Sequence, residues 1–346
     1  MATPKFDPSA AAQPGSGIFG LPSTKKDARV VLIPVPFDAT TSYRGGTMYG
    51  PTTIFNASMQ VDLFDRRLGR VYEQGIFMLD EVVRIQELCQ EATKLGEAIL
   101  ENGGPEEGNE EDLKDLAEIN KICEEVNRYV KAEAAKVLRD GKIPGIVGGE
   151  HSVPFGAIEA SAEKHGEIGI LHIDAHMDLR PEFEGFRWSH ASIMHNVLTR
   201  IPGVKKIVQV GIRDFGENEL DFAESQGNRV VTHFDDANAE RMMNGETWPA
   251  LCKEFITALP QKVYISLDID GLDPSLCPNT GTPVPGGLSF HQVSMLIETL
   301  KNSGKTIVGF DLVEVAPGSD PASDWDGNVG ARVLYKLCGV VQGGQK

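Results

Sequence analysis

The stretch Ile168-Gly-Ile-Leu-His-Ile-Asp-Ala-His-Met-Asp178 joins a short apolar run to alternating acidic and imidazole side chains. The run 168–173 is mostly β-branched and aliphatic, which predicts a buried strand. Alternate residues of an extended segment point the same way, so Asp174, His176 and Asp178 can converge on one point beyond this strand. The stretch therefore predicts a strand whose carboxyl end carries metal-ligating side chains.

Two other segments have the same design. An apolar run, Val263–Leu267, leads directly into Asp268 and Asp270, and the run 143–147 leads into Gly148-Gly-Glu-His-Ser152. Carboxylates that crowd together in a medium of low dielectric repel one another, and a bound divalent cation reverses that cost. Donor sets rich in oxygen with a minority of imidazole suit Mn²⁺ better than ions that prefer thiolates. Together the segments predict a two-metal hydrolytic site.

Strand-like runs alternate with helix-like segments along the chain, which is typical of βαβ units and a parallel sheet. We expect one doubly wound α/β domain with a mostly parallel sheet flanked by helices, over residues 29–346, after an N-terminal arm over residues 1–28. In such folds ligands bind beyond the carboxyl ends of the strands. Helices are predicted over 85–101 and 112–140, with an acidic solvated loop between them at 102–111. Strands are predicted over 30–36, 143–147, 168–173, 206–211, 229–234, 263–268 and 305–313.

Composition limits the possible partners. The formal net charge of −17 over 346 residues argues against a nucleic-acid partner or an anionic membrane surface, since both require basic patches. The five cysteines are scattered and odd in number, which favours a reducing compartment. No run has membrane-spanning length, and the N-terminus has no charged segment followed by an apolar core. We therefore expect a cytoplasmic protein with no membrane partner.

Four motifs carry a family resemblance. The runs Gly-Gly-Glu-His-Ser at 148–152, Asp-Ala-His-Met-Asp at 174–178, Ser-Leu-Asp-Ile-Asp-Gly-Leu-Asp-Pro at 266–274 and Val-Glu-Val at 313–315 resemble signatures of the ureohydrolase superfamily of arginases and agmatinases. The resemblance spans roughly residues 30 to 340 in the order of the family. It implies an arginase-like α/β fold, two Mn²⁺ ions with Ni²⁺ as the alternative, and hydrolysis of a small guanidino substrate.

The resemblance also implies roles for individual residues. His190 matches the histidine of the family that transfers a proton to the leaving nitrogen. Glu314 matches the acid that pairs with the guanidinium group. A homotrimer or homohexamer is expected, as is common in the family. Six residues match the metal ligands, with Asp174 and Asp268 bridging the two ions: His151, Asp174, His176, Asp178, Asp268 and Asp270.

Other polar residues receive more modest interpretations. We expect His172 to support the site through a hydrogen bond instead of binding metal. His195 is a reserve candidate for the proton shuttle, and Asp273 is expected to support the site from behind. Three histidines have no motif context and are interpreted as structural or exposed: His165, His233 and His291.

The chain departs from the family pattern at two positions. Glu150 stands where the family usually has Asp, and its extra methylene shifts any supporting hydrogen bond. Ala191 stands where many relatives have Gly, which narrows the expected pocket.

The substrate is predicted from a missing feature. The Asn- and Ser-rich loop by which arginases grip the amino-acid end of arginine has no counterpart here, and the segment 179–185 resembles agmatinases. Agmatine is therefore the leading substrate, with urea and putrescine as products. Alternatives are a guanidino acid held by Arg44, Arg180 or Arg187, free guanidine, and formiminoglutamate. An inactive metal-binding interaction protein is disfavoured because every ligand, His190 and Glu314 are present.

Overall fold

The computed structural model describes residues 6–320 and 323–341, and these contain an eight-stranded sheet in which all strands are parallel. The strand order is β2-β1-β3-β8-β7-β4-β5-β6. The predicted doubly wound α/β fold is confirmed. The strands are β1 (Val30–Val35), β2 (Ile76–Met78), β3 (Ile143–Gly148), β4 (Ile168–Ile173), β5 (Val204–Ile212), β6 (Val230–Phe234), β7 (Lys262–Asp268) and β8 (Thr306–Val313).

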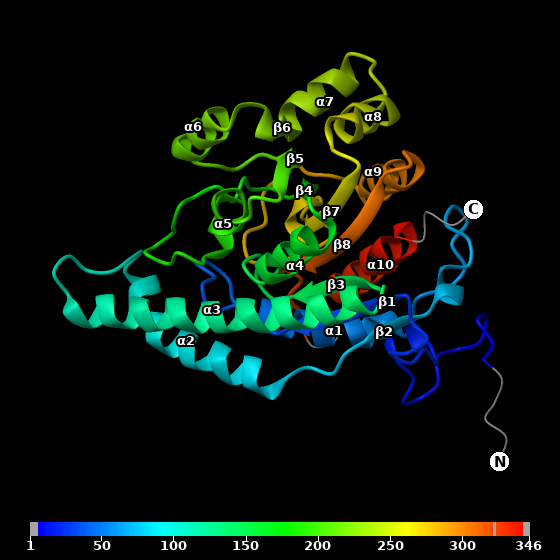
Figure 1. Cartoon of the computed structure of the whole chain (residues 1–346), viewed down its shortest axis with the longest axis horizontal. Coiled ribbons are helices and arrows are strands. Elements are labelled where there is room, and N and C mark those ends of the chain that lie inside the picture. Colours follow the sequence, from blue (N-terminus) through cyan, green and yellow to red (C-terminus); the bar gives the residue numbers. More distant parts are fainter. Residues whose placement is uncertain (1–5, 321–322, 342–346) are drawn as a thin grey trace.

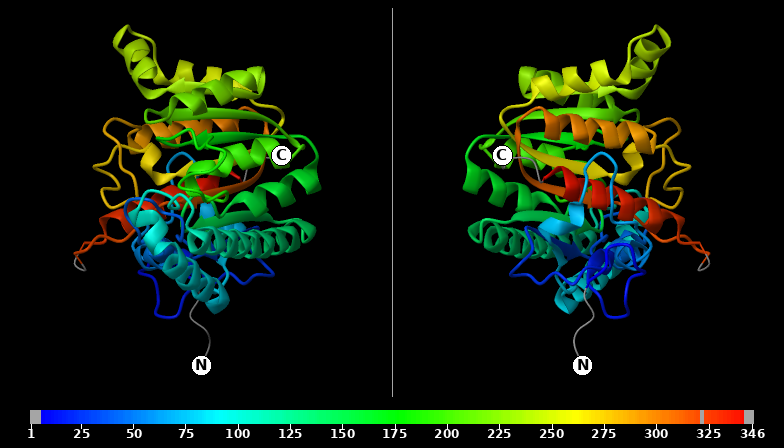
Figure 2. Two further views of the ribbon diagram at one scale, coloured as in Figure 1. Left: turned by 90° about the vertical axis from the view of Figure 1, so that its left-hand side faces the viewer. Right: turned by 90° about the vertical axis from the view of Figure 1, so that its right-hand side faces the viewer.

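Helices cover both faces of the sheet. Side chains of α1, α8, α9 and α10 join one buried apolar cluster, and side chains of α2 to α5 join a second cluster on the opposite face. Figure 1 shows the long helices α2 and α3 side by side at one end of the molecule, and Figure 2 shows the same layers from two sides. The helices are α1 (Gly50–Ser58), α2 (Val83–Glu101), α3 (Glu110–Arg139), α4 (Phe155–His165), α5 (Ile193–Arg200), α6 (Glu217–Ser225), α7 (Asp235–Met243), α8 (Trp248–Ala258), α9 (Phe290–Asn302) and α10 (Trp325–Val340).

The central strands are buried on both faces, which explains why their sequences are mostly apolar. In β4, Ile168 and Ile170 point into the cluster under α2 to α5, whereas Leu171 and Ile173 point into the cluster under α8 to α10. Every residue of β4 is buried. The strand therefore delivers its carboxyl end to a position that side chains already enclose.

The structure corrects the predicted elements at two places. Strand β2, with only three residues, was missed; it pairs with β1, which consequently lies one strand in from the edge and ends at Val35. The predicted acidic loop is shorter than expected because α3 already begins at Glu110. Its N-cap is Asn109, whose side chain accepts hydrogen bonds from two backbone N–H groups of the first turn.

Part of the N-terminal arm is integrated into the core. Ile18, Phe19 and Leu21 are buried in the cluster that contains α1 and α10, and the Phe19 N–H donates to Ser58 Oγ at 2.9 Å. No helix within the described residues is long and apolar enough to cross a membrane.

Gly149 joins three segments at the carboxyl edge of the sheet. Its N–H donates to the carbonyl of Val35 at 3.1 Å, and its carbonyl accepts from the Glu314 N–H at 2.9 Å. A Cβ at this position would overlap the backbone carbonyl of Phe37. The close approach of these backbones therefore requires glycine.

We expect Gly149→Ala to lower the free energy of unfolding by about 1–3 kcal/mol or more, because backbone must move to admit the methyl group. The matched control is Gly96→Ala within α2, where a Cβ would meet Ile119 Cδ1 at 3.5 Å and Phe186 Cζ at 3.6 Å, both ordinary contacts. This control should be neutral or stabilising by about 0.5–1 kcal/mol. Urea denaturation of both variants measures the difference, and equal stability of the two would contradict the packing argument.

Candidate metal centre

The candidate site lies at the carboxyl ends of the four central strands. His151 follows β3, Asp174 follows β4, Asp268 ends β7, and Glu314 follows β8. These strands are neighbours in the order β3-β8-β7-β4, and all run in the same direction. Residues that are up to 163 positions apart in the sequence therefore meet at one edge, as the doubly wound topology requires.

A first cluster forms around the imidazole of His151. Its Nδ1 lies 2.9 Å from Asp174 Oδ2, 3.0 Å from Asp178 Oδ2 and 3.4 Å from Asp268 Oδ2. All four side chains are buried. One imidazole nitrogen thus faces three carboxylate oxygens inside the protein.

A second cluster forms around His176 and shares Asp174 with the first. His176 Nδ1 lies 3.0 Å from Asp270 Oδ2 and 3.5 Å from Asp174 Oδ1. Asp174 therefore presents Oδ2 to one cluster and Oδ1 to the other. All six sequence-predicted metal residues are brought together in two adjoining groups.

The donor chemistry of His151 fits a bound cation. Ser266 Oγ donates to Asp311 Oδ1 at 3.1 Å, so its lone pair accepts from the Nε2–H of His151 at 2.9 Å. In the neutral imidazole this proton placement leaves a lone pair on Nδ1, which has no hydrogen-bond partner within the described residues. A lone pair that faces carboxylate oxygens is repelled by them unless a cation lies between.

The pKa shifts of the carboxylates also indicate a site for a cation. Burial, together with Asp270 and Asp174, raises the pKa of Asp268 well above its ordinary value. Burial and the neighbouring Asp174 likewise raise the pKa of Asp178 to about 6. Asp174 differs, because its interactions with the imidazoles of His172, His151 and His176 outweigh burial and hold its pKa well below the ordinary range. The carboxylates cannot all be ionised at neutral pH without a compensating positive charge.

The backbone is strained at the site. Asp178 and Glu314 have φ values of 54° and 63°, in the left-handed region that non-glycine residues rarely adopt. Such a conformation costs on the order of 1–3 kcal/mol and persists where the surroundings hold it. Here the carbonyl of Asp178 accepts the N–H groups of Met194 and His195, and the Glu314 N–H donates to Gly149.

His172 supports the first cluster through Asp174. Gln209 Nε2 donates to the carbonyl of Met177 and lies 3.0 Å from His172 Nδ1. Because an amide nitrogen can only donate, Nδ1 is the acceptor and His172 Nε2 carries the proton that reaches Asp174 Oδ2, at 2.8 Å. His172 has no free lone pair for a metal, although it lies within the same group of side chains.

Glu314 places one oxygen beside the site without a partner. Its Oε1 accepts from the His151 N–H at 2.7 Å, whereas the buried Oε2 has no hydrogen bond within the described part of the chain. A Cβ at Gly281 would lie 3.5 Å from this Oε2, and the next residue, Thr282, lines the cavity described below. Burial and the nearby Glu150 raise the pKa of Glu314 well above its ordinary value. A group with several N–H donors could satisfy this oxygen.

A cavity of about 160 Å³ opens over the two clusters. His190 lines it and is held by the Thr40 backbone, whose carbonyl accepts from Nδ1 at 2.9 Å. Burial and the charge of His176 lower the pKa of His190 to about 4, so the imidazole is neutral at pH 7. The lining residues are Ser42, His176, Asp178, Arg180, Phe183, His190, Ala191, Asp214, Phe215, Glu219 and Thr282.

Several other predicted residues do not reach this cavity. His195 packs its ring against Phe222, with centroids 4.7 Å apart. The prediction for Asp273 is wrong, because its carboxylate accepts from the Ser275 N–H in a turn and makes no contact with the clusters. Of the three candidate arginines only Arg180 lines the cavity. Three histidines lie elsewhere: His165 at the end of α4, His233 in β6 and His291 in α9.

Sequence reasoning missed four supporting residues. Ser266, Asp311 and Gln209 stand among apolar residues in the buried parts of β7, β8 and β5, and all three are buried. An isolated polar residue within a buried strand is a usable signal, since such groups must be hydrogen-bonded. Thr40 offered no such signal because it lies in a loop.

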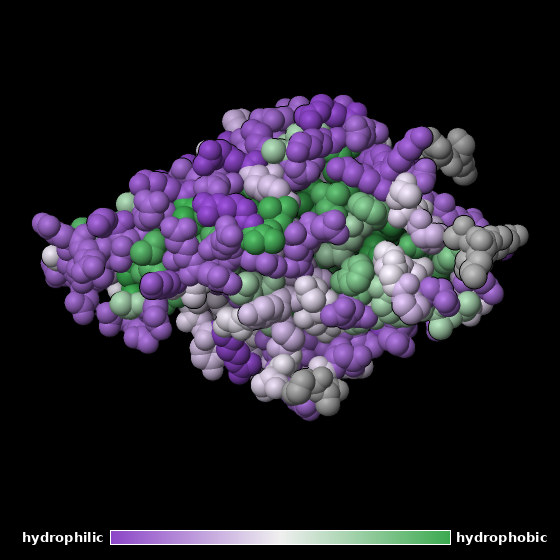
Figure 3. All heavy atoms as spheres, turned by 90° about the horizontal axis from the view of Figure 1, so that it is seen from below, coloured by the Kyte–Doolittle hydropathy of each residue, from purple (hydrophilic) through white to green (hydrophobic). Residues whose placement is uncertain are grey.

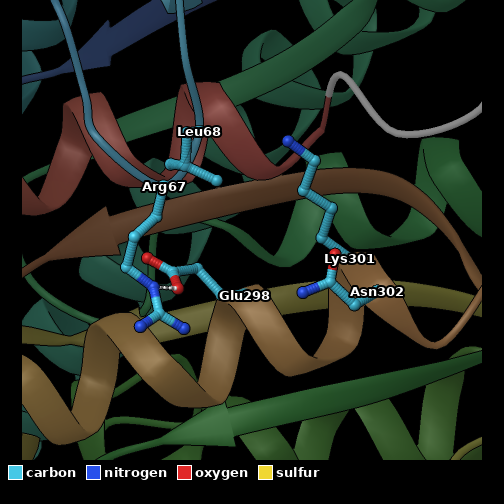
Figure 4. Close-up of a pocket in the computed structure, with 5 residues that line it drawn as sticks. All are labelled: Arg67, Leu68, Glu298, Lys301 and Asn302. Carbon is cyan, nitrogen blue, oxygen red and sulfur yellow. Dashed lines mark hydrogen bonds and ion pairs between the residues drawn. The ribbon is translucent and has the colours of Figure 1, made fainter.

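Another surface cavity, of about 270 Å³, lies at the opposite edge of the sheet. Figure 4 shows Glu298 of α9 facing Arg67, and Lys301 points away from both. The buried Glu298 carboxylate pairs with Arg67 and also with Lys336, at 3.4 Å. Its charge is therefore neutralised within the protein, and it is remote from the metal clusters.

Comparison with known proteins gives a consistent result. Residues 28–339 match the model of the arginase family. The chain is 36% identical over 317 residues to N(1)-aminopropylagmatine ureohydrolase of Thermus thermophilus, with 91% of each chain covered. The structure resembles the agmatine ureohydrolase of Thermoplasma volcanium, with a TM-score of 0.69, 26% identity and 98% and 96% of the two chains covered. It also resembles proclavaminate amidinohydrolase of Streptomyces clavuligerus, with a TM-score of 0.72, 25% identity and 96% and 99% coverage.

The fold, the two carboxylate–histidine clusters and these comparisons agree on one family of metal-dependent hydrolases. The predicted family resemblance is confirmed, and the chain belongs to the arginase family.

Proposed function

We propose that this ureohydrolase cleaves the guanidinium group of a small molecule to urea and an amine, with agmatine as the leading substrate. The observation that carries the proposal is the buried, unpartnered Oε2 of Glu314 beside the two metal clusters. A guanidinium group presents a planar fork of N–H donors that matches a carboxylate. Glu314 would hold the substrate with its central carbon next to the clusters.

Two metal ions would be held by the six residues that make up the two clusters. The oxygen-rich donor set supports Mn²⁺, with Ni²⁺ as the alternative. When bound, two such ions supply an activated water at neutral pH. Asp174, whose two oxygens face the two clusters, would help to hold both ions, and Asp268 and the two histidines would supply further ligands. The six residues are His151, Asp174, His176, Asp178, Asp268 and Asp270.

His190 would transfer the proton that the leaving amine requires. Its Nδ1–H donates to the Thr40 carbonyl, which leaves Nε2 as the nitrogen that takes and returns a proton. The low pKa keeps this nitrogen free to accept a proton at pH 7. His190 lines the cavity together with Asp178, so it lies beside the place where the substrate would react.

The charged residues at the cavity mouth favour a substrate whose end opposite the guanidinium group is cationic. Arg180 is already neutralised, since its Nε lies 3.3 Å from the buried Glu219 and its guanidinium stacks on Phe183 at 4.7 Å. Asp214 lines the same cavity and makes no ion pair with any described residue. The mouth therefore carries an excess negative charge, which attracts an amine and repels a carboxylate.

An assembly of three or six chains is proposed for the protein. Large apolar side chains are exposed near the start of α1 and α2, with exposed fractions of 70% for Tyr43, 56% for Tyr49 and 65% for Val83. Figure 3 shows the molecule from below, and this face also carries apolar residues among hydrophilic ones. Exposed apolar surface of this kind supports contacts between subunits.

Light scattering should therefore give a mass of three or six times 37.6 kDa at micromolar concentration. A mass of 37.6 kDa that does not change with concentration would contradict the proposed assembly.

Replacement of a bridging carboxylate tests the metal assignment. We expect Asp268→Asn to reduce the metal content below two ions per chain. Urea release should fall by more than about 100-fold, because loss of a supporting hydrogen bond alone lowers activity by about 10- to 100-fold. Asp273→Asn is the control on the same loop, because the hydrogen bond of its carboxylate goes to the Ser275 N–H in a turn and not to the six clustered residues; it should retain both ions and full activity. Metal analysis and turnover are measured on the same preparation. Two bound ions and normal turnover in Asp268→Asn would remove Asp268 from the site.

The substrate assignment is tested by a urea-release screen. Agmatine should exceed arginine in kcat/KM by about 100-fold or more, because a buried carboxylate without a partner costs several kcal/mol. Guanidinobutyrate and guanidine complete the panel. Equal rates for arginine and agmatine would contradict the assignment, and a preference for guanidinobutyrate would favour a guanidino acid bound by Arg180.

A further inference from the structure

Glu150 is a fully buried carboxylate next to the metal site that contacts none of the six clustered residues through its side chain. Its exposed fraction is 0%. Oε2 accepts from the Thr40 N–H at 2.8 Å, and Oε1 accepts from the Thr40 hydroxyl at 2.8 Å and from the Ser152 hydroxyl. The carboxylate therefore faces the loop that follows β1, and it binds both donors of Thr40.

Thr40 in turn binds both N–H groups of His190. The Thr40 hydroxyl oxygen accepts from the His190 backbone N–H at 3.2 Å, and the Thr40 carbonyl accepts from Nδ1 at 2.9 Å. These contacts fix the ring orientation and also place the ring proton on Nδ1. His190 can thus present only Nε2 to the cavity.

The loop that carries Thr40 is anchored at its start, where Phe37 and Ala39 are buried and the Phe37 carbonyl accepts from the Glu150 N–H at 2.9 Å. It lies between the end of β1 and the 3₁₀ helix Thr47–Tyr49, and it has no ladder hydrogen bonds. A second carboxylate, Asp38, accepts from the N–H groups of Gly46 and Met48, but it does not contact Thr40. Within the described residues the hydrogen bonds of Thr40 itself go only to Glu150 and His190, so the Glu150 carboxylate fixes both the backbone N–H and the hydroxyl of Thr40.

We propose that Glu150 is a positioning residue for proton transfer: it holds Thr40, and Thr40 holds His190 in one orientation and one tautomer. The inference rests on the proposed function, in which His190 transfers the proton. The distance between Thr40 and the backbone of residue 150 also explains why this position carries Glu and not Asp. An Asp at position 150 would be shorter by one C–C bond of about 1.5 Å, and its carboxylate would no longer reach both donors of Thr40.

The first test is a double-mutant cycle in the metal-loaded enzyme. Glu150→Gln and Thr40→Val should each lower kcat by about 10²-fold with KM changed less than about twofold, because a small displacement of a catalytic group has an effect of this size. Both should retain two ions. In a His190→Asn background neither change should lower kcat further, since the group that they position is already gone. The apparent pKa that His190 contributes to the pH profile of kcat should also shift in Glu150→Gln.

Additive effects in the double mutants would overturn the proposal, as would a loss of metal that accounts for the fall in kcat. The matched control is Glu298→Gln, which makes the same change at a buried glutamate beside the cavity of Figure 4, at the far edge of the sheet. It should lower the melting temperature and leave kcat and its pH profile unchanged.

The second test does not require turnover. The ¹⁵N NMR spectrum of histidine-labelled, Zn²⁺-loaded protein reports the tautomer of each imidazole, and the His190 signals are those absent from His190→Asn. The wild type should show His190 protonated on Nδ1 alone. Glu150→Gln and Thr40→Val should both show a mixture of tautomers, and Glu298→Gln should not.

Unchanged His190 signals in Glu150→Gln and Thr40→Val would overturn the proposal whatever the substrate is. If the wild type released no urea from any guanidino compound, the proposed function would fail, and the NMR spectra would still decide whether Glu150 positions His190.

Discussion

The crowding of buried carboxylates at one edge of the sheet is the constraint on which the rest of the structure depends. Asp174, Asp178, Asp268 and Asp270 converge within hydrogen-bonding distance of two imidazoles, in a region from which water is largely excluded. Such a group of like charges is unfavourable without cations. The parallel sheet makes the convergence possible, because it brings four strand ends to the same place and holds them with backbone hydrogen bonds.

The carboxylates and imidazoles are themselves held by a second set of residues with defined hydrogen-bond directions. Ser266 and Asp311 determine which nitrogen of His151 carries the proton, and Gln209 does the same for His172. His190 is held in the same manner by Thr40. In each case a neighbour fixes a tautomer, and the tautomer decides which atom is available for chemistry.

The sequence was sufficient to predict most of the strands, the fold class and the clustering of the six predicted ligands, because each of these leaves a local pattern. Seven of the eight strands correspond to apolar runs, and the polar motifs follow directly from their ends. Strand β2 was missed because three residues carry no periodicity. The contacts of Glu150 with Thr40 and of His151 with Ser266 join residues 110 and 115 positions apart, so no local pattern reveals them. The expected supporting role of Asp273 failed because its proximity in sequence did not place it near the clusters.

The origin of the site in four separate strands has a consequence for folding. The backbone of His151 is bonded to a side chain 163 residues later, and the clusters join segments that become neighbours only when β3, β8, β7 and β4 have paired. A cation bound there acts as a removable cross-link across the middle of the chain. Because such a cation would bind the assembled sheet more tightly than the unfolded polypeptide, its binding would stabilise the whole domain. The candidate metal centre is thus complete only when these four strands have paired.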